Sequence, residues 1–525
     1  MRDLLLIGVP LRQMNYPPMA LALLKSILHR NGYDVGLSDA NLEYFRHCGG
    51  TMAEYNANTV DLQNRRAFTW PQVEESHFGQ WCRQYVRDLL ARHEPRAVGL
   101  SVFSYDSNLV AYIMARIIRE LAPPDTVIMM GGYGASMPLQ FAKEIDAPEA
   151  ATLAETCKQQ GLINSYILGD GEKAIVDFMR ELDQGRDYEQ KTKFEKLDNL
   201  NEVPFPDYHD LDLDSYRYHS EQQVSRITLP ITGSKGCVRR CQFCDVPSQF
   251  GKWVQRDGAS MAHEAIHNYE EYGATTAYLT DSLVNGSMKD FMLFISTLAE
   301  LRTKKGYNDL EWTGQYITRP AHQIPHDRDY YALMKASGCG TVSVGAESGS
   351  NRVLKDMDKK MRVEDLFAEL EHFRKHGLSM LVNVLVSYPT ETREDFEETI
   401  LMLKNWQTFF ADKTLEKIGA MPWWFSHGLN PWTEKHGEAE GFYINPGDMY
   451  HWWYAGNPEL TLQERIFRRL TVSKVVTSLN FPLAMSEKYQ IKQMKMWADS
   501  YAEDYYKWLN NLDEYKRIKA SGTQS

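Results

Sequence analysis

The sequence predicts an α/β protein with two successive parallel sheets and a third, mostly α-helical segment at the end of the chain. Short apolar runs alternate with amphipathic stretches of about ten to fifteen residues in the first part, and a second such series begins near residue 226. A polar stretch containing Pro204 and Pro206 separates the two series and has the composition of a linker. The final part is instead rich in tryptophan, tyrosine, glycine and proline.

The first series predicts a doubly wound, flavodoxin-like (Rossmann-type) domain over residues 1–200. Apolar runs suggest strands at 3–9, 33–41, 97–104, 126–136 and from 164 onwards. Helical patterns lie between them, and a polar and aromatic insertion occupies residues 46–95. Right-handed crossovers through such helices give a parallel sheet that is covered on both faces.

Ligands of such a sheet bind at the carboxyl ends of its strands. Ser101, Ser104, Gly131 and Gly132 occupy two of these ends, where glycine lets a bulky ligand approach the backbone. The glycines could equally be turn residues. No G-x-G-x-x-G follows the first strand, so a dinucleotide is poorly supported.

The second series, residues 226–422, predicts a (β/α)6 partial barrel of the TIM type. Six apolar runs lie at 227–237, 274–282, 310–317, 341–348, 378–389 and 415–421. Functional residues of such barrels lie on loops at the strand carboxyl ends. Cys237, Cys241 and Cys244 all fall on the first of these loops. Residues 201–225 form the predicted linker, and residues 423–525 form the helical, aromatic-rich segment.

Composition excludes several classes of protein. Lysine and arginine number 58 against 70 acidic residues, and no basic run would follow a nucleic acid backbone. No apolar run is long enough for a membrane span, and the amino-terminal run is too short for a signal peptide. The other four cysteines are scattered, which argues against a disulfide framework. We expect a cytoplasmic protein.

The spacing C-x3-C-x2-C places three thiolates on one loop, which suits a soft metal or an iron-sulfur cluster. Structural zinc would need a fourth ligand nearby, and the sequence offers no local fourth cysteine. Three ligands on a four-iron cluster leave one iron open for a substrate or cofactor.

This loop resembles the signature of radical S-adenosylmethionine (SAM) enzymes, C-x3-C-x-aromatic-C, with Phe243 at the aromatic position. The surrounding GSKGCVRRCQFCD is similar to the version in the branch that carries an amino-terminal cobalamin-binding domain. Further likenesses are TDS at 280–282, VGAESGS at 344–350 and VSYPTETREDF at 386–396, where relatives have a G-x-P-x-E-T-like loop. The resemblance covers roughly residues 1–420.

The resemblance implies that the three cysteines hold a 4Fe-4S cluster and that SAM binds its fourth iron. It also implies that Phe243 lies near the adenine, Asp281 and Ser282 near the methionine amino group, and Glu347 near the ribose. Two alternatives stay open: Asp281 could be a helix N-cap, and Glu347 could simply end a strand.

The same resemblance implies a cobalamin site in the first domain. D-x-H-x-x-G, the motif that supplies a histidine ligand to cobalt, is absent. Arg12, with Gln13, Met14 and Asn15, would then lie nearest the lower face of the corrin. Ser101, Ser104, Gly131 and Gly132 would surround the nucleotide tail. Alternatively, the domain is vestigial and only braces the barrel.

By resemblance, the expected activity is methylation of an unactivated carbon of a small-molecule or natural-product substrate, through a 5′-deoxyadenosyl radical and methylcobalamin. The expected partners are that substrate and an external electron donor such as flavodoxin or ferredoxin. A radical rearrangement, ring contraction or lyase reaction is the alternative, and a redox-sensing module without catalysis is a third hypothesis. Paired aromatics such as Trp423-Trp424 and Trp452-Trp453 could bind substrate or form a core.

Overall fold

The computed structural model describes residues 2–479, apart from residues 13, 65–68, 140–144, 146, 148–150, 187–196, 220–225, 325–328, 423–430, 437–441, 445–451, 455–456, 458 and 461. Contacts divide the chain into two compact units, residues 1–231 with 263–278, and residues 232–262 with 279–525. The domain boundaries at 200, 225 and 422 stay a prediction.

The first unit contains a five-stranded sheet of order β2-β1-β3-β4-β5, in which every neighbouring pair is parallel. Its strands are β1 (Leu4–Gly8), β2 (Val35–Asp39), β3 (Ala97–Ser101), β4 (Val127–Gly131) and β5 (Ser165–Ile167). This is the flavodoxin-like order, which confirms the predicted doubly wound fold.

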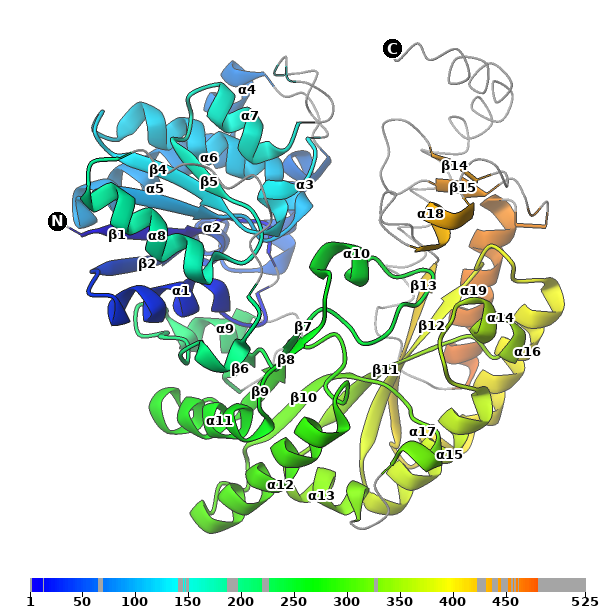
Figure 1. Cartoon of the computed structure of the whole chain (residues 1–525). Helices are drawn as coiled ribbons and strands as arrows, with labels where there is room; N and C mark the ends of the chain where they lie inside the picture. The colour runs from blue at the N-terminus through cyan, green and yellow to red at the C-terminus, as the bar shows by residue number, and fades with distance from the viewer. Residues whose placement is uncertain are drawn as a thin grey trace. The chain divides into compact units, whose positions relative to one another are not determined.

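Helices cover both faces of this sheet (Figure 1). They are α1 (Met19–Arg30), α2 (Ala40–His47), α5 (His77–His93), α6 (Asn108–Leu121), α7 (Leu153–Gln159) and α8 (Gly171–Asp183). Alternate residues of β1 enter two separate apolar cores, Leu5 and Ile7 one and Leu4 and Leu6 the other. The insertion predicted at 46–95 is largely helical, with α3 (Met52–Asn64) and α4 (Trp70–Glu75) preceding α5.

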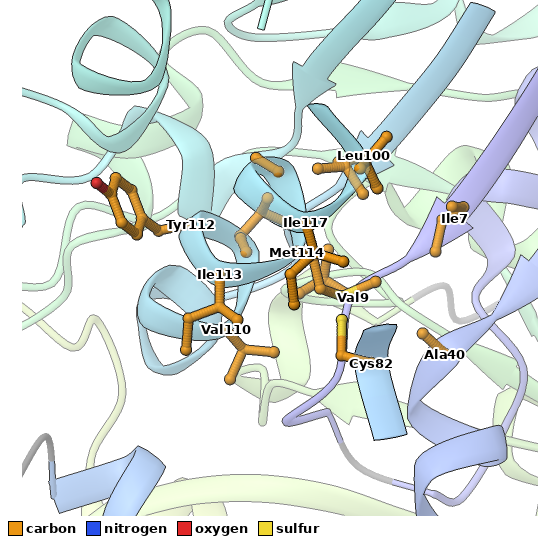
Figure 2. Close-up of a cluster of buried hydrophobic side chains, with 14 of the residues drawn as sticks. Ile7, Val9, Ala40, Cys82, Leu100, Val110, Tyr112, Ile113, Met114 and Ile117 are labelled. Carbon is orange, nitrogen blue, oxygen red and sulfur yellow. The ribbon is translucent and has the colours of Figure 1, made fainter. Parts of the chain in front are cut away.

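The larger of the two cores lies where α5 and α6 pack on the sheet (Figure 2). Ile7 and Leu100 come from the sheet, Met114 and Ile117 from α6 and Cys82 from α5, and all five are buried. Cys82 is thus a small core residue, as expected for a scattered free cysteine.

The second sheet has the strand order β13-β12-β11-β10-β9-β6 (Figure 1). Its strands are β6 (Thr228–Ile231), β9 (Thr276–Leu279), β10 (Glu311–Tyr316), β11 (Thr341–Glu347), β12 (Ser379–Val386) and β13 (Leu415–Pro422). The helices between them are α11 (Gly258–Tyr272), α12 (Met288–Lys305), α13 (Tyr330–Ala336), α14 (Asn351–Asp356), α15 (Val363–His376), α16 (Arg393–Asn405) and α17 (Gln407–Ala411). Six strands in sequential order with intervening helices agree with the predicted partial barrel.

The carboxyl-terminal segment is described only in parts. These are α18 (Pro431–His436), the antiparallel pair β14 (Phe442–Ile444) and β15 (Trp452–Tyr454), and α19 (Leu462–Ser478). Trp423-Trp424 and the part of the predicted helical segment beyond residue 479 lie outside the described residues. Within the described part of the chain, no helix is both long and apolar enough to cross a membrane.

Candidate active site

The three clustered cysteines lie on the loop between β7 (Ser234–Lys235) and α10 (Val246–Phe250). Cys241 is buried, and Cys237 and Cys244 are half-buried. The backbone N–H of Cys244 donates to the carbonyl oxygen of Cys241 at 3.0 Å, so the last two cysteines share one tight turn. The thiols of all three lie close enough to influence one another electrostatically.

Gly236 starts this loop in a left-handed conformation, with φ of 79°. A Cβ at this position would lie 3.2 Å from the Cα of Trp253. Trp253 immediately precedes β8 (Val254–Gln255), which pairs antiparallel with β7. The glycine therefore lets the loop begin against the backbone that anchors it.

Burial raises the pKa of all three thiols, that of Cys244 to about 12. Lys359 opposes this effect at Cys237 and Cys241. Binding of iron would therefore release protons from the thiols. Among the described residues, no three histidine, cysteine, aspartate or glutamate side chains are grouped to hold a single metal ion. Ligation of a cluster by these cysteines stays a prediction.

Glu347 ends β11 and forms an ion pair with Lys359, at 2.7 Å between Oε1 and Nζ. The two side chains are only 11% and 10% exposed. Glu347 adopts a left-handed backbone, with φ of 63°, beside a break in the β11–β12 register. A Cβ at Gly345 would lie 2.1 Å from the Glu347 carboxylate, so a larger residue there would displace this carboxylate.

Lys359 is the residue that sequence reasoning missed. Burial lowers its pKa, but Glu347 and the thiols of Cys241 and Cys244 outweigh burial and the net pKa is raised. Its Nζ lies 5.5 Å from the centre of the Phe243 ring. No sequence signal pointed to it, because the surrounding LKDMDKKM has the composition of an ordinary solvated turn. The structure thus places a buried cation beside the cysteine loop.

Phe243, which was predicted to lie near the adenine, is partly buried and packs against an apolar cluster. The cluster consists of Val353, Met357, Leu385, Tyr388 and Trp432. Burial, Asp356 and then Cys241 raise the pKa of Tyr388, so this cluster adjoins the cysteine loop.

Asp281 follows β9 and is buried. Its Oδ2 accepts the backbone N–H of Gly233 at 2.9 Å, whereas its Oδ1 has no hydrogen-bond partner among the described residues. Burial raises the pKa of Asp281 to about 6, against the opposing influence of Ser234 and Gly233. The alternative that Asp281 caps the next helix is wrong, since Ser287 caps α12. Ser282 is half-buried beside it.

Buried polar atoms without a hydrogen-bond partner recur at the carboxyl ends of the strands. Asp281 Oδ1 follows β9, Thr318 Oγ1 follows β10 and Ser387 Oγ follows β12. Buried polar groups in native proteins are nearly always paired. These unpaired atoms, on the side of the sheet where barrels build their sites, fit a polar ligand such as SAM.

In the first unit, the predicted tail-binding residues are brought together at the edge of β3 and β4. Ser101 stands opposite Gly131 in the strand register. Gly132 has φ of 96°, and a Cβ there would lie 2.4 Å from the carbonyl oxygen of Val102. Ser101, Ser104, Gly131 and Gly132 are all half-buried.

Large aromatic side chains are exposed at this same edge. Phe103 follows β3 and is 59% exposed, and Tyr133 follows β4 and is 37% exposed. Exposed apolar side chains beside a glycine-lined strand edge fit a large ligand such as cobalamin.

Arg12 lies on the loop after β1 and is held firmly. It pairs with Asp39 at 2.6 Å and donates to the carbonyl oxygen of Tyr16 at 2.8 Å. Tyr216 donates to the same Asp39 carboxylate. The Asn41 amide nitrogen donates to the carbonyl oxygen of Arg12 and to the sulfur of Met14. The loop is therefore fixed by contacts within its own unit.

Comparison with known proteins agrees with this geometry. Residues 231–403 match the model of the radical SAM superfamily. An uncharacterized methyltransferase of Pyrococcus horikoshii is 25% identical over 63% of this chain and 68% of its own length. The cytidylyl-2-hydroxyethylphosphonate methyltransferase of Streptomyces wedmorensis is 21% identical over 71% of this chain and 69% of its own length.

Among solved structures, the radical SAM methyltransferase TsrM from Kitasatospora setae, with cobalamin and a [4Fe-4S] cluster bound, has a TM-score of 0.59 and 18% identity. The match covers 85% of this chain and 79% of TsrM. Residues 231–403 are therefore a radical SAM domain, and the fold of the chain is similar to that of TsrM, a radical SAM methyltransferase solved with cobalamin bound.

Proposed function

We propose that this enzyme binds a 4Fe-4S cluster, SAM and cobalamin and methylates an unactivated carbon of a small molecule. The proposal rests on one observation: the chain contains two candidate ligand sites, each at the carboxyl ends of strands in a parallel sheet. One edge has three thiols beside a buried cation and unpaired polar atoms, and the other has Gly132 and exposed aromatics. When bound, these groups supply a 5′-deoxyadenosyl radical and a transferable methyl group.

The residues of the chain would position and shield this chemistry. Cys237, Cys241 and Cys244 would hold three irons and leave the fourth for SAM. Asp281 Oδ1 is suited to accept a hydrogen bond from the SAM amino group, because it is buried and unpaired. Lys359 is suited to offset the negative charge of the thiolates, since its pKa keeps it protonated.

In the first unit, Ser101, Ser104, Gly131 and Gly132 would take the nucleotide tail of cobalamin. Arg12 would lie below the corrin and would supply no ligand to cobalt, because its guanidinium is bound to Asp39. The loop also contains no histidine, so we propose that cobalamin binds without an imidazole ligand from this loop.

The substrate and the electron source are also proposals. We propose a small-molecule substrate and a small one-electron carrier protein, such as a flavodoxin or ferredoxin, as the reductant. All seven cysteines are free thiols, which supports a reducing compartment such as the cytoplasm.

The first test needs no knowledge of the substrate. The protein is purified anaerobically with cobalamin supplied, and its iron, sulfide and corrinoid contents are measured. It is then incubated with reductant and SAM, and methylcobalamin is measured by mass spectrometry. We expect four irons and one corrinoid per chain and formation of methylcobalamin. A bound corrinoid that receives no methyl group would favour a rearrangement or lyase reaction instead.

Two variants test which of the two candidate sites holds the iron-sulfur cluster and which holds cobalamin. Cys241→Ala should lose iron and keep the corrinoid. Ser104→Tyr should keep iron and lose the corrinoid, because the larger side chain fills the edge of β3. Asp125→Tyr is the matched control, since Asp125 is exposed at the opposite, amino end of β4. Loss of corrinoid from both tyrosine variants, or from neither, would contradict the assigned site.

A further inference from the structure

Lys359 lies in a turn whose backbone is strained on both sides of it. Helix α14 ends at Asp356, and the backbone N–H of Lys359 then donates to the carbonyl oxygen of Leu354 at 3.0 Å. Asp358 and Lys360 have φ of 54° and 56°, in the left-handed region that side chains other than glycine seldom adopt. These two residues pair with each other near the surface, whereas Lys359 between them is only 10% exposed. The strained turn thus places one lysine inside the protein and leaves its neighbours outside.

This turn is joined to the cysteine loop by a main-chain hydrogen bond. The backbone N–H of Gln242, in the cysteine loop, donates to the carbonyl oxygen of Met357 at 2.9 Å. The Nζ atom of Lys359 also lies within the range of a cation–π contact with the ring of Phe243. Because main chain holds main chain, the lysine is kept at one position beside the cysteines.

The positive charge of Lys359 acts on the cysteines more strongly than the negative charge of its partner Glu347. Burial raises the pKa of Cys241, which Lys359 lowers and Glu347 raises further, and the effect of the lysine is the larger. Burial also raises the pKa of Cys237, against the backbone N–H of Arg239 and then the charge of Lys359. The field of this ion pair at the two thiols is therefore net positive.

A fixed positive charge favours the more negative state of a nearby cluster. Each thiolate ligand adds a negative charge to an iron-sulfur cluster, and reduction adds one electron more. The reduced cluster is therefore stabilised by the cation more than the oxidised cluster is. Salt screens a buried charge much less than a surface charge, and the potentials of such clusters depend on local charge and solvent exposure.

We propose that the buried charge of Lys359 raises the reduction potential of the cluster on the cysteine loop, and that Glu347 limits this increase. The inference rests on the proposed function, because it needs a cluster at these cysteines. It goes beyond neutralisation of the thiolates, since it gives the two partners of one ion pair opposite effects on the same potential. The pair thus adjusts how readily a one-electron carrier reduces the cluster.

The test is a redox titration of cluster-loaded protein without SAM. Electron paramagnetic resonance measures the reduced cluster at fixed potentials, with iron and sulfide content on the same samples. Glu347→Gln is compared with the double variant Glu347→Gln, Lys359→Met, because neither buries an unpaired carboxylate. The ratio of reduced to oxidised cluster should be about tenfold lower in the double variant, as for one charge at roughly 10 Å and an effective dielectric constant of about 20. For one electron, a tenfold change is about 59 mV.

Glu347→Gln alone should show a higher ratio than the wild type, because it removes the opposing charge. Lys359→Arg keeps the cation and should stay close to the wild type. Lys360→Met is the matched control and should leave the ratio unchanged, since Lys360 lies in the same turn but is 59% exposed. A loss of structure alone would not move the potential in opposite directions.

Equal ratios in Glu347→Gln and the double variant would overturn the inference, as would a ratio in Glu347→Gln at or below that of the wild type. The second comparison still decides if the double variant loses its iron. A wild-type protein that takes up no cluster would overturn the proposed function as well, whereas a loaded cluster with equal ratios overturns only the inference.

Discussion

Lys359→Met should strongly destabilise the barrel around β11. The substitution removes the cation from a pair whose side chains are 10% and 11% exposed and whose charged atoms are 2.7 Å apart. Glu347 would then be a buried carboxylate without a counter-charge. Breaking such a pair from one side costs about 3–5 kcal/mol, whereas a surface pair is worth about 0–1 kcal/mol.

The double variant Glu347→Gln, Lys359→Met separates the loss of the ion pair itself from the cost of burying an unpaired carboxylate. It removes both charges at once, so no unpaired charge is buried, and we expect it to recover most of the loss. Lys360→Met is the matched control. Lys360 is the next residue and also pairs with a carboxylate, that of Asp358, but its side chain is 59% exposed.

Amide hydrogen exchange of peptides from β11 and β12 is the appropriate assay, because it reports one region of a chain with two units. Exchange in Lys359→Met should be about a hundredfold faster or more, and Lys360→Met should match the wild type. The reasoning is refuted if Lys359→Met exchanges like Lys360→Met, or if the double variant is no more protected than Lys359→Met.

Two further predictions concern buried carboxylates of the barrel. Glu369 accepts a hydrogen bond from Tyr316 at 2.6 Å, and burial raises its pKa to about 7. Its contribution to stability is therefore full below its unfolded pKa, near 4.5, and is lost as pH rises towards 7, by about 3 kcal/mol in total. Urea unfolding from about pH 5 to about pH 8 should show this decline in the wild type and a flatter profile in Glu369→Gln; equal slopes would contradict it. Arg468 and Glu391 form an ion pair at 2.8 Å, and their side chains are 1% and 0% exposed. Arg468→Met should leave Glu391 without its counter-charge and lower the local free energy of unfolding by about 3–5 kcal/mol. Amide hydrogen exchange of residues 387–392 should then be faster, whereas Phe467→Ala, at a neighbour that is 50% exposed, should leave it unchanged.

The sequence predicted the architecture well because its signals are local. Alternating apolar runs identified the strands of both sheets, and the spacing of Cys237, Cys241 and Cys244 identified the loop with the candidate site. It also grouped Ser101 with Gly131, since parallel strands end at the same edge.

The rest of the site depends on contacts that local pattern does not encode. Lys359 and Arg468 look like solvated charges in the sequence, and only the fold shows that each is buried against a glutamate. The left-handed backbone of Ser387 is likewise set by Glu391, four residues further on, and by a helix much later in the chain. Sequence periodicity carries no information about such pairings.

The ion pair between Arg468 and Glu391 can form only late in the synthesis of the chain. The two residues are 77 positions apart, and Arg468 comes later. At synthesis rates of about 5–20 residues per second, the loop after β12 emerges from the ribosome roughly 4–15 s before the arginine that fixes it. Until Arg468 is available, residues 387–392 lack the ion pair that fixes them. The carboxyl end of β12 should therefore reach its final conformation only after α19 has been synthesised.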